Sequence, residues 1–299
     1  MTIAYHEVYV HPLPENHRFP MEKYSLLAGQ LKRQGYGDDA SWIEPGLALE
    51  RDIQRVHDEG YWNRLKSGQI SRHDERASGF KWSPQLVRRE QTIMEGTLQC
   101  ARRAAEGEVA LNIAGGTHHA FKDRPEGFCL LNDIMIAALH LQHEKLAKNI
   151  LVVDLDVHQG NGTASMAKYH PNVFTFSMHG AQNYPFRKEE SDLDIALPTG
   201  TTDQAYLSAL DEGLTQAFSL SKPEVVFYQC GVDVLETDKL GKLSLTAAGC
   251  SERDRVVLDR CKSLQVGVAC SMGGGYSPSI GHIVDAHMST FHHARNLWS

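Results

Sequence analysis

Apolar residues follow two alternating patterns along the chain. In some segments they recur at helical spacing, as in Leu86-Val87 and Ile93-Met94, which predicts amphipathic helices. Ser83-Pro84 precedes that run and is typical of a helix start, because Ser caps the first turn and Pro is tolerated in it. The long helices predicted in this way are Met21–Arg33, Ser83–Glu106, Leu131–Glu144, Asp203–Leu220 and Thr246–Leu264.

Short β-branched runs lie between these helices and predict strands. The central runs are almost continuously apolar, as expected for strands covered by helices on both faces. The predicted strands are Ile3–Tyr5, Ala40–Ile43, Glu108–Ile113, Ile150–Leu155, Val173–Ser177, Asp194–Leu197, Val225–Tyr228 and Val266–Ala269. Their alternation with helices predicts a three-layer α/β fold built on one parallel sheet. The polar segment Lys66 to Arg76 reads as a surface loop rather than a linker, so residues 1–299 are expected to form a single domain.

Composition narrows the class of protein. The 299 residues are 41% hydrophobic and 22% charged, which is sufficient for a large core. Thirty basic against 37 acidic residues give a net charge of −7, which disfavours direct binding to nucleic acid. Neither a membrane-spanning run nor a signal-peptide core is present. The 6 cysteines form no CxxC pair, so we expect reduced thiols and a cytoplasmic protein.

Polar and glycine-rich segments follow five of the predicted strands. In parallel sheets, ligands bind beyond the carboxyl ends of the strands, where such segments converge. The sequence therefore predicts one shared site. Its segments are Gly115–His119, Asp154–His158, Met178–Gly180, Gly231–Asp233 and Gly273–Tyr276.

Asp154, Asp156 and His158 alternate at the period of a strand, so their side chains can share one face. Burying carboxylates together is costly unless a cation or hydrogen bonds neutralise them. With Asp233 from another strand exit, Asp156 and His158 complete a set of three ligands, the pattern of a catalytic metal site. Zinc and Fe(II) both suit such ligands. The alternative is that Asp156 caps a helix and His158 lies on the surface. Capping from Asn161 or Gly162 is also expected, because a helix begins near there.

His118-His119 follows two glycines at a strand exit and can approach a ligand closely. The two imidazoles are either further metal ligands or an acid/base pair. Tyr276 follows three glycines and serves either in packing or as a hydrogen-bond donor. A second pair, His292-His293, is expected on a solvated helical face.

Taken together, these segments resemble the histone deacetylase family. The motifs occur in family order: GGTHHA at 115–120, GFCLLND at 127–133, VDLDVHQGNGT at 153–163, SMH at 177–179, GVD at 231–233 and GGGY at 273–276. HRFPMEKY at 17–24 and GFKWSPQLV at 79–87 are similar to bacterial members. The form His158-Gln159-Gly160-Asn161-Gly162 and the short chain are most similar to the class IV branch.

The resemblance implies an arginase/deacetylase-type domain with an eight-stranded parallel sheet. It implies a zinc-dependent hydrolase that removes acetyl or other acyl groups from lysine side chains of peptides or proteins. By match to the family's motifs, the zinc ligands are Asp156, His158 and Asp233. The catalytic group is His118, His119 and Tyr276, with Asp154 and Asn161 as partners of the two histidines. The structural potassium site corresponds to Asp154, Asp156, His158, Ser177 and Met178, and the tunnel walls correspond to Gly127, Phe128, Tyr184 and Leu240.

Some positions depart from the family's pattern, and some alternatives stay open. Gln159 and Asn161 replace the His and Asp of the class I branch, and Met21 and Glu22 stand where some members place an arginine that lines an acyl exit channel. The alternatives are an acetylpolyamine amidohydrolase, a long-chain lysine deacylase and a silent acyl-lysine binder. A two-manganese, arginase-like site is disfavoured by Asn161. Acyl-chain preference and oligomeric state do not follow from the sequence.

Overall fold

The strands in the described part of the chain belong to one parallel sheet. The computed structural model describes residues 1–37 and 41–298, and these form an 8-stranded sheet in the order β2-β1-β3-β8-β7-β4-β5-β6, in which every pair is parallel. The strands are β1 (Thr2–Ala4), β2 (Ser41–Ile43), β3 (Val109–Asn112), β4 (Ile150–Asp154), β5 (Val173–Gly180), β6 (Leu193–Leu197), β7 (Val225–Gln229) and β8 (Gly267–Ser271). The central strands are buried along their whole length, which explains their continuous apolar character.

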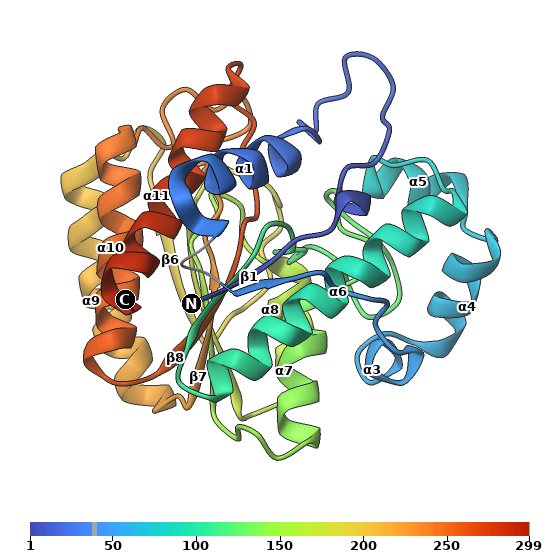
Figure 1. Cartoon of the computed structure of the whole chain (residues 1–299), viewed down its shortest axis with the longest axis horizontal. Coiled ribbons are helices and arrows are strands. Elements are labelled where there is room, and N and C mark those ends of the chain that lie inside the picture. Colours follow the sequence, from blue (N-terminus) through green and yellow to red (C-terminus); the bar gives the residue numbers. More distant parts are fainter. Residues whose placement is uncertain (38–40, 299) are drawn as a thin grey trace.

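Helices cover both faces of this sheet (Figure 1). On one face α9 packs against β5 and β6, α10 packs against β8, and α11 packs against β3. On the other face α6 packs against β3 and β8, and α7 packs against α6. The helices are α1 (Lys23–Leu31), α3 (Glu50–Gln54), α4 (Glu59–Ser67), α5 (Arg72–Ser78), α6 (Pro84–Ala105), α7 (Asp133–His143), α8 (Asn161–Ala167), α9 (Asp203–Ser221), α10 (Ala247–Ser263) and α11 (Ile280–Trp298). Two short helical turns, η1 (Glu7–Tyr9) and η2 (Lys32–Tyr36), flank α1.

The predicted three-layer α/β fold is confirmed. Each predicted strand corresponds to an observed one, and the ends agree within two residues except at β5, which continues three residues beyond the predicted end at Ser177; Ala40 lies outside the described residues. The predicted start of α6 is also observed, because Ser83 Oγ accepts a 3.0 Å hydrogen bond from the Leu86 amide and Pro84 occupies the first turn.

The prediction of a loop from Lys66 to Arg76 is wrong. Helix α4 runs to Ser67, and α5 begins at Arg72 with a capping box in which the Ser71 and Asp74 side chains each accept from the other's backbone amide. The segment is polar because both helices expose most of their length to solvent. Among the described residues, none of the helices is both long enough and apolar enough to cross a bilayer. All 6 cysteines are buried free thiols.

Candidate active site

Three side chains at the carboxyl ends of β4 and β7 converge on one point. His158 Nδ1 lies 3.0 Å from Asp156 Oδ1 and 3.1 Å from Asp233 Oδ2, and all three residues are buried. Asp156 and His158 follow β4, and Asp233 follows β7, its neighbour in the sheet. The structure thus brings together the predicted ligand set Asp156, His158 and Asp233.

The electrostatics of this group fit a divalent cation. Burial alone raises the pKa of Asp233, and the neighbouring Asp156 carboxylate adds to this, so that the value reaches about 7. Burial opposes a charge on His158, yet the hydrogen bonds that its Nδ1–H donates to the two carboxylates outweigh this effect and raise the pKa of the imidazole to about 10. The two buried carboxylates are therefore stabilised by a positive charge placed next to them. Two carboxylate oxygens and one imidazole nitrogen are a donor set that suits zinc or Fe(II).

A glycine is required beside these ligands because the chain passes too close for a side chain. A Cβ atom on Gly274 would lie 2.0 Å from Asp233 Oδ2 and 2.7 Å from Asp156 Oδ2. The Gly274 amide instead donates a 2.9 Å hydrogen bond to Asp156 Oδ2. The glycine-rich strand exit thus orients one ligand through its backbone.

His118 forms a buried pair with a carboxylate. Its Nδ1 lies 2.7 Å from Asp154 Oδ2, and both side chains are almost fully excluded from solvent. Burial opposes the imidazolium form of His118, but the charge and hydrogen bond of Asp154 outweigh it and raise the pKa of His118 to about 9. His118 therefore holds a proton at neutral pH.

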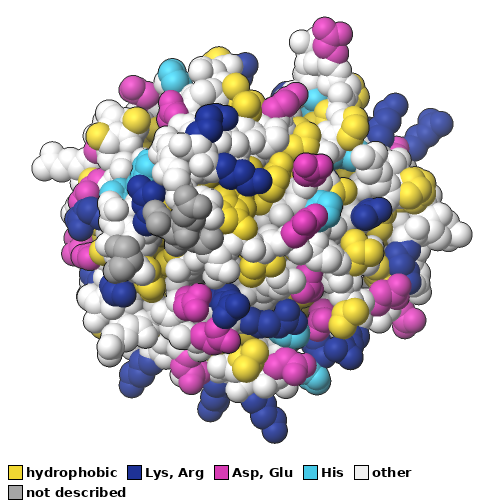
Figure 2. Space-filling model, in the orientation of Figure 1, with side chains coloured by type: hydrophobic (Ala, Val, Ile, Leu, Met, Phe, Trp, Pro, Cys, Tyr) yellow, Lys and Arg dark blue, Asp and Glu magenta, His cyan; other side chains and the backbone are white. Residues whose placement is uncertain are grey.

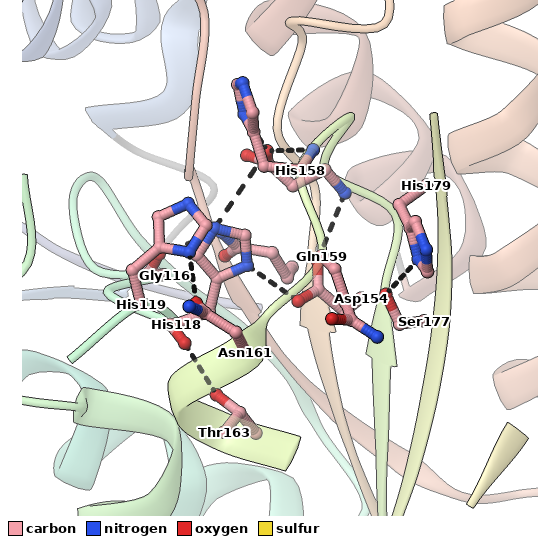
Figure 3. A network of polar contacts seen from close by, with 12 residues as sticks. Gly116, His118, His119, Asp154, His158, Gln159, Asn161, Thr163, Ser177 and His179 are labelled. Carbon is pink, nitrogen blue, oxygen red and sulfur yellow. Dashed lines mark hydrogen bonds and ion pairs between the residues drawn. The ribbon is translucent and has the colours of Figure 1, made fainter. Parts of the chain in front are cut away.

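His119 lies beside His118, with ring centroids 4.1 Å apart, but in a different electrostatic environment (Figure 3). Its Nδ1 is 2.7 Å from Asn161 Oδ1, a neutral partner. Burial lowers the pKa of His119 well below its usual value, and the nearby His118 and His158 add to the effect. His119 is therefore the neutral member of the pair.

Glu126 determines which way the Asn161 amide points. Asn161 Nδ2 donates a 2.9 Å hydrogen bond to Glu126 Oε1, and the phenol of Tyr184 donates to the same oxygen. Because an ionised carboxylate only accepts, the Asn161 oxygen must face His119. His119 then carries its proton on Nδ1 and a lone pair on Nε2. The expectation that Asn161 caps the helix is wrong: α8 has Gly160 at its N-cap position, without a side-chain cap.

The predicted tunnel residues line a cavity of about 360 Å³ that has His119 and His158 among its walls. Gly127, Phe128, Tyr184 and Leu240 all contribute, and so does Tyr276. The ring centroids of Phe128 and Tyr276 lie 5.9 Å apart, so two aromatic rings form adjacent parts of the cavity wall. Burial, and then the Asp233 and Asp156 carboxylates, raise the pKa of Tyr276 well above its usual value, so the phenol keeps its proton.

The residues predicted for a potassium site lie around the ends of β4 and β5. Asp154 is the register partner of Ser177, and Met178 follows on β5, while Asp156 and His158 extend beyond β4. Potassium binding at these residues stays a prediction. Gln159 points away from the two histidines, and its side chain bonds Asp194 Oδ1 and the backbone of Glu189 at 2.8–2.9 Å. It fastens the loop after β4 to the edge of the sheet.

Three supporting residues were not identified from the sequence. The buried carboxylate of Asp133 accepts from the amides of Gly116 and Thr117 at 2.8–3.0 Å and so shapes the loop before His118. Glu126 directly precedes the Gly127-Phe128 motif, but no motif or spacing in the sequence marks it as part of the site. Lys23 is fully buried, and its Nζ donates a 2.7 Å hydrogen bond to the Gly273 carbonyl. Burial lowers the pKa of Lys23 to about 8.

Comparison with known proteins identifies the family of the chain. The family model described as histone deacetylase domain matches residues 17–291. An uncharacterised protein of Picosynechococcus is 43% identical over 296 residues, covering 99% of each chain. Histone deacetylase 2 of Arabidopsis thaliana is 29% identical over 90% of this chain and 72% of its own, and acetoin utilization protein AcuC of Bacillus subtilis is 26% identical over 87% and 73%.

A solved structure shares the fold. The crystal structure of the HDA15 HD domain superposes with a TM-score of 0.84 at 21% identity, covering 98% of this chain and 90% of that one. The chain belongs to the histone deacetylase family. Its placement in the class IV-type branch stays a prediction.

Proposed function

We propose that the protein is a metal-dependent deacetylase that hydrolyses the side-chain amide of acetyl-lysine in peptides or proteins. The observation that carries the proposal is the convergence of Asp156, His158 and Asp233 with a neutral and a charged histidine beside an aromatic-walled cavity. A silent acyl-lysine binder has no use for this pair of differently protonated histidines.

Asp156, His158 and Asp233 would hold the metal ion, for which zinc is the first candidate and Fe(II) the second. Such an ion, when bound, polarises the amide carbonyl and lowers the pKa of a bound water.

The two histidines divide the proton transfers between them. As the water oxygen attacks the carbonyl carbon, His119 Nε2 takes the proton that the water loses. As the C–N bond breaks, the charged His118 gives a proton to the departing lysine nitrogen, which leaves as a free amine. The Tyr276 phenol donates a hydrogen bond to the carbonyl oxygen as negative charge develops there, and donors of this kind contribute about 3–4 kcal/mol.

The size of the site favours a short acyl group. Behind the metal ligands lies a second cavity of about 30 Å³, lined by Phe19, Tyr24, Arg89 and Ile93 among others. A space of this size holds only one or two water molecules. An acetyl methyl needs little more, whereas a long alkyl chain would need Phe19 and Ile93 to move. This favours a deacetylase over a long-chain deacylase.

The mouth of the larger cavity disfavours a polyamine. Arg18, Arg76 and Lys242 line this cavity, and none of its other lining residues among positions 1–37 and 41–298 is an Asp or a Glu. An acetylated polyamine keeps positive charges beyond its amide, so these three cations would repel it.

A substrate panel tests the proposal. One zinc-loaded sample is offered an acetyl-lysine peptide with neutral flanks, the same peptide with a long-chain acyl group, and an acetylpolyamine. We expect the acetyl-lysine peptide to give the highest kcat/KM. A higher value for either other substrate, or no hydrolysis of any of them, would contradict it.

A further inference from the structure

The charge around the mouth of the cavity is opposite in sign to that of the whole chain. The protein carries a net charge of −7, and Figure 2 shows acidic and basic side chains interspersed over the face it displays. By contrast, the Lys, Arg, Asp and Glu residues that line the cavity, among those the structure describes, are Arg18, Arg76 and Lys242. All three are exposed. We call these three residues the basic rim.

The positive charges of the basic rim are not neutralised by ion pairs within the described part of the protein. Within residues 1–37 and 41–298, neither Arg18 nor Arg76 forms an ion pair or a side-chain hydrogen bond, and Lys242 Nζ donates only to the carbonyl of Gln182, at 3.1 Å. The three cations come from different segments: the loop before α1, the α5 helix and the loop after β7. A chain lying across the mouth would meet positive charge from more than one segment.

Two carboxylates that contact residues of the cavity wall are already engaged. Asp238 accepts from the backbone amides of Leu240, Gly241 and Tyr276 at 2.6–2.9 Å. Glu126 accepts from Asn161 and from Tyr184, and Arg124 lies 3.7 Å away. Neither carboxylate lines the cavity, so neither presents a free negative charge to a substrate at the mouth.

An apolar side chain stands among these cations. Phe186 lines the same cavity and is 91% exposed, although most large aromatic side chains of this protein are buried. An exposed aromatic beside a tunnel entrance offers contact area to a polypeptide that passes over it. This combination suits a peptide segment better than a small free anion.

We propose that the basic rim selects acetyl-lysine that lies within an acidic polypeptide segment, with Asp or Glu near the modified residue, over acetyl-lysine in a Lys/Arg-rich segment. This inference rests on the proposed deacetylase function. The acetyl-lysine side chain enters the cavity between Phe128 and Tyr184, and the flanking carboxylates face the rim. Each opposite-charge pair at about 8 Å in water changes affinity by about twofold, so three pairs together give up to about tenfold at low salt.

The experiment compares three peptides of equal length around one acetyl-lysine, with acidic, neutral or basic flanks. For the wild-type protein at low salt we expect kcat/KM to be about fivefold to tenfold higher for the acidic peptide than for the neutral one. The basic peptide should have a lower kcat/KM than the neutral peptide. Most of the difference should lie in KM. In about 0.5 M salt, where screening is effective within a few ångströms, the three values should converge to within about twofold.

Two variants with the same change in net charge separate the rim from the charge of the whole protein. The rim variant is Arg18→Glu, Arg76→Glu and Lys242→Glu. The control is Arg51→Glu, Lys145→Glu and Lys148→Glu, whose residues are exposed and line no part of this cavity. The readout is the ratio of kcat/KM for the acidic and basic peptides, which a general loss of activity leaves unchanged. We expect the rim variant to invert this ratio and the control to keep it above one.

Three results would overturn the inference: a wild-type preference for basic flanks, equal ratios in the rim and control variants, or a preference that salt does not weaken. Binding of fluorescently labelled versions of the same peptides, followed by anisotropy, keeps the test independent of turnover. If no peptide is hydrolysed, the proposed function fails. The binding data then test the basic rim separately: tighter binding of the acidic than of the basic peptide supports the inference, and equal or weaker binding contradicts it.

Discussion

The contact between Asn161 and Glu126 makes it possible to move one negative charge toward His119 without changing the total charge. In the wild-type protein the Glu126 carboxylate does not contact the His119 imidazole directly. The neutral side-chain amide of Asn161 lies between them and forms a hydrogen bond with each. The double variant Asn161→Asp, Glu126→Gln exchanges the two groups. It places the carboxylate directly against His119 Nδ1 and an amide behind it.

The size of the effect follows from Coulomb's law. The exchange brings a unit charge from roughly 7 Å to roughly 4 Å from the imidazole, which at an effective dielectric constant of about 20 strengthens their attraction by about 2 kcal/mol. Since one pKa unit corresponds to about 1.4 kcal/mol, the pKa of His119 should rise by about one unit. A base must be deprotonated to act, so the acidic limb of kcat/KM should move to higher pH by about the same amount.

The single variant Asn161→Asp is the informative control. It puts a second carboxylate against Glu126, where Asn161 Nδ2 now lies 2.9 Å from Glu126 Oε1. Two like charges at roughly 4 Å repel by about 4 kcal/mol at an effective dielectric constant of about 20, which favours a state in which the pair shares one proton. The charge near His119 then changes little, and the acidic limb should move less than in the double variant.

The assay is a pH series of kcat/KM on a neutral-flank acetyl-lysine peptide, with all proteins matched for zinc content. If the limb of the double variant stays in place or moves toward acid, His119 is not the base. If the single variant moves as far as the double, Glu126 has no electrostatic influence on His119.

Three further predictions concern single residues. Tyr276→Phe should keep its zinc and lose about a hundredfold or more in kcat with little change in KM, because the phenol acts mainly in the transition state. An unchanged kcat would show that Tyr276 serves only in packing. Gly274→Ala should lower the zinc affinity about 10–100-fold in a chelator competition, because its methyl group would lie 2.0 Å from Asp233 Oδ2. The circular dichroism spectrum should stay native. A wild-type zinc affinity would show that the loop adjusts freely. Ser83→Ala should cost about 1 kcal/mol in urea unfolding and leave kcat/KM unchanged, because it removes only the cap of α6; an unchanged midpoint would mean that another group replaces the cap.

The sheet could be predicted from the sequence because its strands are buried on both faces. Segments such as Ile150–Asp154 and Val225–Gln229 are apolar almost throughout and are separated by long helices, a pattern that few other folds produce. The short helices α3 to α5 could not be predicted in the same way. They are polar and only 5 to 9 residues long, so the apolar spacing that marks a helix is too brief to recognise.

Some residues of the site could be predicted from the sequence, and others could not. The predicted metal group could be found because its members follow strands that are neighbours in a parallel sheet, so the topology alone brings them together. Glu126 acts through a loop that folds back onto α8, and no periodicity marks such a contact. Arg18, Arg76 and Lys242 are separated by more than 50 residues at each step, and only the tertiary fold places them around one opening.

The central claim is that one metal ion, held by Asp156, His158 and Asp233, is required for hydrolysis of acetyl-lysine. The most direct test is a titration of metal-free protein with zinc, in which acetate release from an acetyl-lysine peptide is followed against zinc added per chain. We expect the rate to rise from near zero and to reach a plateau at one equivalent, and Asp233→Ala to stay near zero at that ratio. Full activity without metal, a plateau at two equivalents, or a wild-type titration curve for Asp233→Ala would contradict the claim.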